Sequence, residues 1–551
     1  MIFKTLLFVI SVSSFLAAGF IAPSGEGKEI FLIKQFILLF ISFISLTAFF
    51  IKSRGFQENL GKIPGKKSII VLFSIGSILF LTQAFMLHGE DGDYVISTAL
   101  DPIAYFIQAK IFLSGHINVP SHELKEFFST GYFINDGKYL SMYTPGWPLI
   151  LSIGLILKLP WIVSPLLGLF TLFIIYLIGT QLYDSKTGLV AAVLCLFSQS
   201  FFIFTPTLMS EPATLFFSSL FFYLAIKMLK EPNRLNSLFS GFILGILFLI
   251  RPYSAFSISL PIFIYFFFEI PFKDAKKYLL PFSILILSFL PALIIFFIYN
   301  LIQTGNAFLT PLTYYNPLNT LGFGIRSNDI IIQGKPYTFF NSITNLFINL
   351  VELNKDSVLF LFIFLFFIII NKKNKWDYLL FAILSTIIFL HMFFFFRSTR
   401  YYYAAYFAIF LLSARGINLS TILFRKVFPG ISIMNLNYLL LLFIMVANVF
   451  IISPPKKFLQ RYELYKQYRD PFNLVRKSNL SDSIVFLKSV PEVWNNISYY
   501  VQNPLNYDGK VLFAKDLGNR NVELIEYYPE KKFYIYEFDQ KSKSGKLTRL
   551  K

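Results

Sequence analysis

The sequence predicts an all-α polytopic membrane protein with about thirteen transmembrane helices, followed by a small C-terminal α/β domain. Two observations predict this fold class. Of the 551 residues, 56% are apolar and 14% are charged, against roughly 45–50% and about 25% in soluble domains. Many apolar runs also have the ~20 residues that a helix needs to cross the bilayer core. This composition excludes a soluble enzyme and a disordered scaffold, and the single Cys195 excludes an intrachain disulfide.

Helix-length apolar runs follow one another along residues 1–452, which we expect to form one transmembrane domain. They lie at 1–22, 30–51, 68–87, 160–182, 187–205, 211–229, 237–250, 254–269, 278–299, 357–370, 376–396, 401–417 and 433–452. The first run has no small-residue cleavage signature and is predicted to be a retained helix.

The distribution of Lys and Arg predicts the orientation, because short basic loops remain cytoplasmic. Basic clusters alternate with the predicted spans and fall on one side: Lys52 to Lys67, Lys227 to Arg234, Lys273 to Lys277, Lys372 to Lys375, and Arg415 to Lys426. We therefore expect an integral protein of a bacterial inner (plasma) membrane with a cytoplasmic amino terminus. Loops 88–159 and 300–356 would then be external.

The first external loop, 88–159, differs in charge from the rest of the chain. Residues 88–145 contain seven acidic and three basic residues, whereas the whole protein has a net charge of +19. The end of the loop, Gly146 to Leu159, is apolar but too short for a span, and Pro148 and Pro160 bound it. It is predicted to be a re-entrant or interfacial helix.

Residues 453–551 have ordinary polarity and are predicted to form an external soluble α/β domain. Strand-like runs at Ser483 to Leu487, Lys510 to Phe513 and Lys532 to Phe538 are separated by turn signals. The basic excess of this segment does not contradict an external location, because large domains translocate largely regardless of charge.

Asp101 is the first candidate for chemistry. Pro102 suits the first turn of a helix with Asp101 as its N-cap, and Tyr105 would lie on the same face as Asp101. A carboxylate there can act as a general base on a hydroxyl group. The same spacing also fits a carboxylate that only caps the helix, so both interpretations stand.

Three further constellations lie at the expected outer ends of spans. Tyr139–Pro148 would bring aromatic rings to the interface, either toward a lipid-linked ligand or as an aromatic belt. Ser210-Glu211-Pro212 opens a span and can be a helix-capping box. Arg251-Pro252-Tyr253 and the segment from Arg397 through Arg400 to Tyr401 place cations at the external side. Arginine matches phosphate oxygens bidentately, although arginines that anchor a helix at the interface are the alternative.

Other signals are weaker. The Tyr314-Tyr315-Asn316 region either lines a ligand cavity or forms a turn-rich loop. The four histidines have no metal-ligand spacing, and no phosphate-binding Gly-rich loop or Gly-x-Ser-x-Gly sequence occurs. We therefore predict no metal site and no cofactor, while the sequence leaves open whether a divalent metal assists. No nucleic acid partner is expected.

In this order the motifs resemble those of the GT-C fold glycosyltransferases, in particular the protein O-mannosyltransferases and the bacterial aminoarabinose transferases. The resemblance is carried by the acidic loop with Asp101-x-x-x-Tyr105, Tyr143 to Leu149, Ser210-Glu211-Pro212, Gly245 to Pro252, and Arg400-Tyr401-Tyr402. It covers roughly residues 88–420.

The resemblance implies an enzyme that moves a sugar from a polyprenyl-phosphate donor to a lipid, glycan or protein acceptor on the external face. Asp101 would be the base. The leaving phosphate would be held by Arg251, Arg397 or Arg400, and the remaining cavity residues would be Tyr105, Tyr143, Glu211 and Tyr401. Where the family frequently has Asp-Glu, Pro102 follows Asp101 here, so a second catalytic carboxylate would come from Asp91, Asp93 or Glu211.

Two other functions are compatible with the sequence. A transporter or flippase of lipid-linked sugars would explain the spans and the outer arginines, but it predicts mid-membrane ionisable residues and two related halves. The charges instead lie at span ends, and no twofold pattern is visible. A non-catalytic scaffold that presents the external domain is the third hypothesis.

Overall fold

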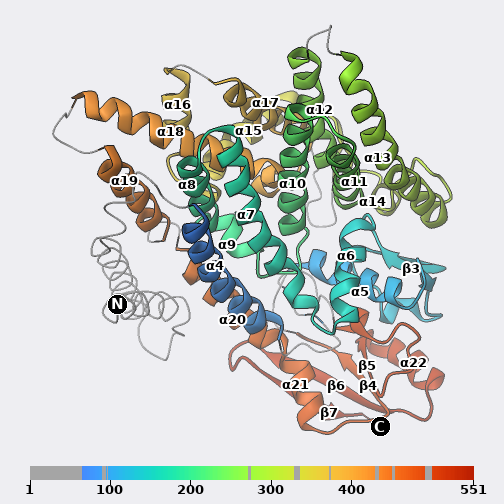
Figure 1. Ribbon diagram of the computed structural model, residues 1–551. Coiled ribbons are helices and arrows are strands. Elements are labelled where there is room, and N and C mark those ends of the chain that lie inside the picture. Colours follow the sequence, from blue (N-terminus) through green and yellow to red (C-terminus); the bar gives the residue numbers. More distant parts are fainter. Residues whose placement is uncertain are drawn as a thin grey trace.

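The computed structural model describes residues 65–89, 95, 97, 99–270, 275–327, 336–371, 374–427, 433–449, 453–490 and 499–550. The predicted spans at 1–22 and 30–51, and the carboxylates Asp91 and Asp93, lie outside these residues. Element labels follow Figure 1.

Most of the described chain is helical, and a bundle of helices forms its centre (Figure 1). These helices are α4 (Gly65–His88), α7 (Val163–Leu182), α8 (Ser185–Leu196), α9 (Gln199–Phe204), α10 (Glu211–Lys230), α11 (Arg234–Ile250), α12 (Pro252–Glu269), α13 (Ala275–Thr304), α16 (Leu361–Ile369), α17 (Lys375–His391), α18 (Tyr406–Val427) and α19 (Ile433–Ala447). The helices α14 (Pro311–Tyr315) and α15 (Phe339–Asp356) lie between α13 and α16 along the chain.

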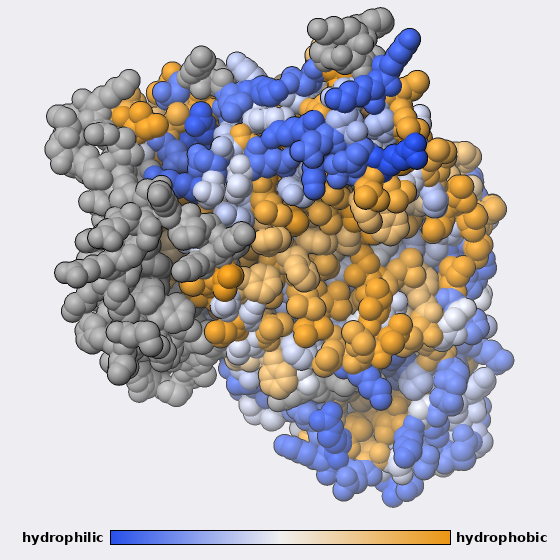
Figure 2. All heavy atoms as spheres, in the orientation of Figure 1, coloured by the Kyte–Doolittle hydropathy of each residue, from blue (hydrophilic) through white to orange (hydrophobic). Residues whose placement is uncertain are grey.

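A broad apolar belt crosses the surface of this bundle between two hydrophilic zones (Figure 2). Such a belt suits the hydrocarbon core of a bilayer. Among the described residues, five helical segments are long and apolar enough to cross a membrane: Ile70–His88, Pro160–Leu182, Glu211–Lys230, Lys276–Thr304 and Thr399–Leu423. The protein is thus a helical integral membrane protein, and the count of thirteen spans stays a prediction.

The prediction of a single span at 187–205 is wrong. The segment forms two short helices, α8 and α9, with a break at Ser198. Ser198 has an extended backbone, and its hydroxyl donates to the carbonyl oxygen of Asp356 at 3.0 Å. The apolar content of the run gave no indication of this break, because the hydrogen bond comes from a distant part of the chain.

Helices α11 and α13 pack closely because glycines line the contact. A Cβ atom on Gly241 would lie 2.0 Å from the carbonyl oxygen of Leu285, and one on Gly245 would lie 2.8 Å from the Ala292 Cβ. This spacing of small residues four apart is a common device for bringing helix backbones together in membranes. The contact holds the end of α11 in place, where Arg251 follows.

The first loop folds into a compact layer at one end of the bundle. It contains α5 (Leu100–Leu113), the 3-10 turn η1 (Lys125–Phe127), the strands β1 (Val119–Pro120), β2 (Phe133–Asp136) and β3 (Lys138–Ser141), and α6 (Gly146–Ile156). The antiparallel sheet has the order β1-β3-β2, with Phe133 opposite Ser141. Gln108 of α5 accepts a hydrogen bond from the Ser141 amide at 2.9 Å. Helix α6 has 11 residues, which is too short to cross the bilayer core and is within the length of an interfacial or re-entrant helix.

The C-terminal segment forms a four-stranded sheet of order β5-β4-β6-β7, in which β4 pairs in parallel with β5 and β6, and β7 is antiparallel to β6. Its strands are β4 (Ser483–Leu487), β5 (Val511–Lys515), β6 (Lys532–Asp539) and β7 (Ser544–Arg549), and its helices are α20 (Pro454–Tyr468), α21 (Asp470–Lys477) and α22 (Asn521–Tyr527). The three predicted strands correspond to β4, β5 and β6.

This sheet packs against the layer formed by the first loop (Figure 1). Gln502 donates to the carbonyl oxygen of Val95 at 2.8 Å, and His122 Nε2 lies 3.0 Å from the Tyr528 hydroxyl. Arg469 donates to the carbonyl oxygen of Leu87 at 2.6 Å. The C-terminal segment therefore stabilises the loop that carries Asp101.

The α11–α13 contact gives a stability prediction. We expect Gly241→Ala to destabilise the protein by about 1–3 kcal/mol, because the new methyl group would overlap backbone atoms of α13. Equilibrium unfolding in mixed micelles measures the effect. Gly76→Ala is the matched control, since its Cβ would approach only flexible leucine side-chain tips, those of Leu169 at 3.0 Å, Leu172 at 3.2 Å and Leu196 at 3.7 Å. Equal stability of the two variants would contradict the packing described here.

Candidate active site

Four charged side chains from distant parts of the sequence meet at one end of the bundle. Asp101 lies on α5, Glu211 at the start of α10, and Arg251 between α11 and α12, while Arg400 lies in the 3-10 turn η4 (Thr399–Ala405). Arg400 Nη2 is 3.1 Å from Asp101 Oδ1, and Arg251 Nη2 is 2.7 Å from Glu211 Oε1. Arg400 Nε lies 3.6 Å from the same Glu211 oxygen, so Arg400 bridges both carboxylates.

Asp101 does not cap its helix, which corrects the prediction from sequence. Ala99 occupies the N-cap position without a side-chain cap, and Asp101 instead faces Arg400 and Tyr143. The Tyr143 hydroxyl donates to Asp101 Oδ1 at 2.5 Å. Burial raises the pKa of Asp101, but the charge of Arg400 and the hydrogen bond from Tyr143 outweigh burial and hold the pKa below its ordinary value of 3.8. Asp101 is therefore an ionised carboxylate at neutral pH.

Glu211 pairs with both arginines from outside the cavity. Its side chain is fully buried and does not line the cavity described below. Ser210 occupies the N-cap position of α10 but makes no side-chain cap, contrary to the predicted capping box. Its hydroxyl accepts from Arg251 Nη2 at 2.9 Å and lies 3.2 Å from the Tyr105 hydroxyl. The Ser210-Glu211 pair thus orients Arg251.

The segment around Arg400 is held by its neighbours. The Thr399 hydroxyl donates to Asp356, a half-buried carboxylate at the end of α15. The Arg400 guanidinium lies over the Tyr401 ring, 5.5 Å from its centroid. Arg397 behaves differently: it is exposed and does not line the cavity. Of the two arginines predicted in this segment, the structure brings only Arg400 to the cluster.

The turn between β3 and α6 positions Tyr143. Thr144 donates to the carbonyl oxygen of Ile250 at 2.8 Å, directly before Arg251. Gly146 allows this approach, because a Cβ at that position would lie 2.4 Å from the Leu249 backbone. The Tyr143 ring packs against Tyr105, with centroids 4.5 Å apart. Burial, followed by the charge of Asp101, raises the pKa of Tyr143, so its hydroxyl stays protonated and donates to Asp101.

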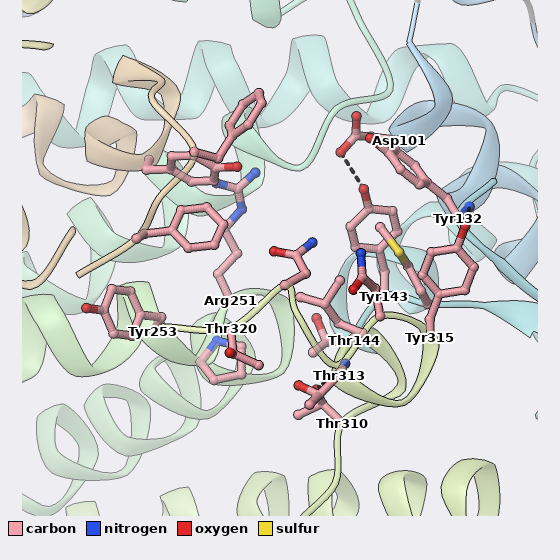
Figure 3. A pocket seen from close by; sticks show the side chains of 18 of the residues that line it. Asp101, Tyr132, Tyr143, Thr144, Arg251, Tyr253, Thr310, Thr313, Tyr315 and Thr320 are labelled. Carbon is pink, nitrogen blue, oxygen red and sulfur yellow. Dashed lines mark hydrogen bonds between the residues drawn. The ribbon is translucent and has the colours of Figure 1, made fainter. Parts of the chain in front are cut away.

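These residues face a cavity of about 750 Å³ (Figure 3). Six of the predicted site residues line it: Asp101, Tyr105, Tyr143, Arg251, Arg400 and Tyr401. The sequence left two interpretations of the Tyr314-Tyr315-Asn316 region open, and in the structure Tyr315 and Asn316 line the cavity. Sequence reasoning did not identify the other polar lining residues, which include Tyr132, Thr310, Thr313, Asn319, Thr320 and His391. No spacing signal marks them, because each comes from an irregular loop or a helix end.

The described residues form no cluster of carboxylates and histidines that could hold a metal ion. Within the described ranges, no three His, Cys, Asp or Glu side chains come close enough to hold a metal ion together. The charged groups that the cavity offers are thus guanidinium groups and one ionised carboxylate. Such a set can bind an anionic group on one side and accept a proton on the other.

Comparison with solved structures identifies the fold. The architecture is the GT-C glycosyltransferase fold, which confirms the resemblance predicted from the motifs. A model of the dolichyl-phosphate-mannose-protein mannosyltransferase family matches residues 158–295. This match includes Glu211 and Arg251 but not Asp101 or Arg400. Comparison with curated protein sequences gave no significant match.

Solved structures show the similarity over most of the chain. ArnT from Cupriavidus metallidurans bound to undecaprenyl phosphate has a TM-score of 0.50 at 8% identity, covering 85% of this chain and 93% of ArnT. The apo state of the same ArnT gives a TM-score of 0.51 at 8% identity, with 86% and 93% covered. The apo oligosaccharyltransferase of Archaeoglobus fulgidus gives 0.47 at 12% identity, with 87% and 70% covered. At these identities the two ArnT structures establish the fold alone.

The charge cluster gives a second stability prediction. We expect Glu211→Gln to lower the free energy of unfolding by about 3 kcal/mol, because it leaves two partly buried arginines without their shared carboxylate. Denaturation in mixed micelles checks this value. Arg397→Gln, at the exposed arginine, should change stability by less than about 0.5 kcal/mol. If both variants behave alike, Glu211 does not anchor the cluster.

Proposed function

We propose that this protein is a membrane glycosyltransferase that transfers a sugar from a polyprenyl-phosphate donor to an acceptor at the external face of the plasma membrane. One observation carries the proposal: two guanidinium groups and one ionised carboxylate face the same cavity at the end of a transmembrane bundle. The undecaprenyl phosphate bound to ArnT supports the choice of donor class.

The proposed reaction is a single displacement with inversion. Asp101 takes the proton from an acceptor hydroxyl, and the acceptor oxygen forms a bond to the anomeric carbon of the sugar. The bond from that carbon to the phosphate oxygen breaks, and its electron pair leaves with the phosphate. Arg251 and Arg400 stabilise the charge on the leaving phosphate. Glu211 is a positioning residue in this scheme, because it contacts only the arginines and lies outside the cavity.

Arg400 links donor binding to the activation of the base. In the structure it donates to Asp101, and this pairing makes Asp101 a weak base. A donor phosphate competes with Asp101 for the same guanidinium. When Arg400 turns to the phosphate, the carboxylate loses its main stabilising charge and its pKa rises toward that of a useful base. Donor binding would therefore precede acceptor activation.

The helix directions support an external site. Helix α10 begins at Glu211 beside the cavity and ends at Lys230, about 30 Å away for 20 residues. Lys227, Lys230 and Arg234 thus lie at the opposite end of the bundle from Asp101. Because short basic loops are retained in the cytoplasm, the cavity would open on the external side.

Asp101→Asn tests the role of the base. We expect kcat for sugar transfer to fall by about 10²- to 10⁴-fold, the usual contribution of a general base. Affinity for bare polyprenyl phosphate should rise, because Arg400 no longer has a competing carboxylate. Carrier release from a polyprenyl-phosphate sugar measures the first effect, and direct binding measures the second.

Asp136→Asn is the matched control, since Asp136 lies in the same loop but is mostly exposed and pairs only with Lys125. Full transfer activity in Asp101→Asn would remove Asp101 as the base. A transporter would move the lipid without cleaving it, so carrier release by the wild type also separates the enzyme from a flippase.

The pH dependence of the reaction tests whether Arg400 leaves Asp101 for the donor phosphate. In the free protein the pKa of Asp101 lies below 3.8, so kcat/KM for the donor should lose activity only below that pH. In the donor complex the pKa is higher, and the acid limb of kcat should therefore appear at a higher pH. Steady-state profiles between about pH 3.5 and about pH 8 measure the two limbs. Coincident limbs would mean that Arg400 keeps its contact with Asp101.

A further inference from the structure

The cavity has two chemically different sides. Arg251 and Tyr253 lie on one side, whereas Tyr132, Tyr143 and Tyr315 lie together on the other (Figure 3). A third group of polar side chains comes from a single stretch, residues 310–320, which contains α14 and the loop after it. We call Thr310, Thr313, Asn316, Asn319 and Thr320 the hydroxyl–amide patch.

The loop that carries this patch has a defined shape. Asn316 accepts a hydrogen bond from the Leu318 amide at 3.0 Å and donates to the carbonyl oxygen of Ser327 at 3.3 Å. The Gly322 amide donates to the carbonyl oxygen of Phe393 at 2.7 Å. The Tyr132 amide donates to the Tyr315 hydroxyl at 3.2 Å, which joins the loop to β2. Hydrogen bonds to Tyr132 and Phe393 therefore hold the loop that carries the patch on both sides.

Several polar groups of the patch retain hydrogen-bonding capacity. The side-chain oxygen of Asn319 is buried and has no hydrogen-bond partner in the described structure. The Thr310 and Thr313 hydroxyls lie 3.0 Å apart, so this pair keeps one O–H to donate elsewhere. Thr320 makes no side-chain hydrogen bond to another described residue while it lines the cavity. Unsatisfied buried polar atoms are costly, and a ligand with several hydroxyl groups would satisfy them.

In the proposed reaction, the charged groups that line the cavity all serve the donor phosphate or the acceptor hydroxyl. Among the described lining residues, the carboxylate is Asp101 and the guanidinium groups are Arg251 and Arg400, and each forms an ion pair. A cationic amino sugar would need a carboxylate of its own, and an acidic sugar would need a further cation. Threonine, asparagine and tyrosine instead offer both donors and acceptors, together with aromatic faces for a sugar ring.

We propose that the hydroxyl–amide patch is the subsite for the donor sugar, and that this sugar is uncharged and rich in hydroxyl groups. The inference rests on the proposed function, in which Arg251 and Arg400 hold the phosphate. The sugar ring then lies between these arginines and the tyrosine side, with the patch beneath it.

Binding measurements with the full-length protein in nanodiscs test the proposal. The probes are bare undecaprenyl phosphate and its conjugates with glucose, mannose, galactose or arabinose, beside a conjugate with the cationic 4-amino-4-deoxyarabinose. At least one neutral conjugate should bind about tenfold more tightly than bare undecaprenyl phosphate. The cationic conjugate should bind no more tightly than bare undecaprenyl phosphate. Thr313→Val and Asn319→Leu should each reduce this gain by about threefold to tenfold, the range for one neutral hydrogen bond.

Thr344→Val is the matched control, because the Thr344 hydroxyl bonds only to its own helix and lies on an exposed face of α15. Both patch variants should keep the wild-type affinity for bare undecaprenyl phosphate, which shows that they are folded and still hold the phosphate. If both variants keep the full extra affinity for the neutral conjugate, or if the cationic conjugate binds most tightly, the neutral-sugar subsite is wrong. The proposed function is not affected by either outcome. If bare undecaprenyl phosphate does not bind the wild type, the proposed function itself fails.

Discussion

The buried carboxylate of Glu211 is the constraint on which the site depends. A carboxylate without water is stable only beside cations, and Glu211 has two of them, Arg251 at 2.7 Å and Arg400 at 3.6 Å. These arginines are far apart in the sequence, so their shared partner brings α10, the α11–α12 junction and η4 to one point. Arg400 also contacts a second carboxylate, that of Asp101. In the proposed mechanism, a donor phosphate draws Arg400 away from Asp101 and so raises the pKa of this carboxylate.

Close backbone contacts make this convergence possible. Glycines on α11 let α13 approach, and Gly146 lets the start of α6 touch the end of α11. The α11–α13 contact lies along the interior of both helices, whereas the Gly146 contact fixes the end of α11 directly before Arg251. The C-terminal sheet adds a further support, because it packs against the layer that contains α5 and therefore Asp101. The charged cluster thus rests on packing contacts that are themselves apolar or backbone-mediated.

The cavity combines a charged side with a neutral polar side. The charged side belongs to the bundle, whereas the hydroxyl–amide patch belongs to the loop between α13 and α15. In the proposed function, the arginines recognise the phosphate and the loop sets the choice of sugar, and loops tolerate substitution better than packed helices do. The substrate class proposed here follows from the residues of that loop.

The sequence by itself determined the membrane class, the apolar segments, the strands β4 to β6, and the residue types at the outer helix ends, including Asp101, Arg251 and Arg400. These are local properties, since span length and strand patterning depend on neighbouring residues. The tertiary structure alone decided that Asp101 pairs with Arg400, 299 residues away, that Glu211 pairs with both arginines outside the cavity, and that Arg397 does not line the cavity. It also decided the break at Ser198 and the hydroxyl–amide patch. Such contacts depend on how distant helices and loops pack, and no local pattern encodes them.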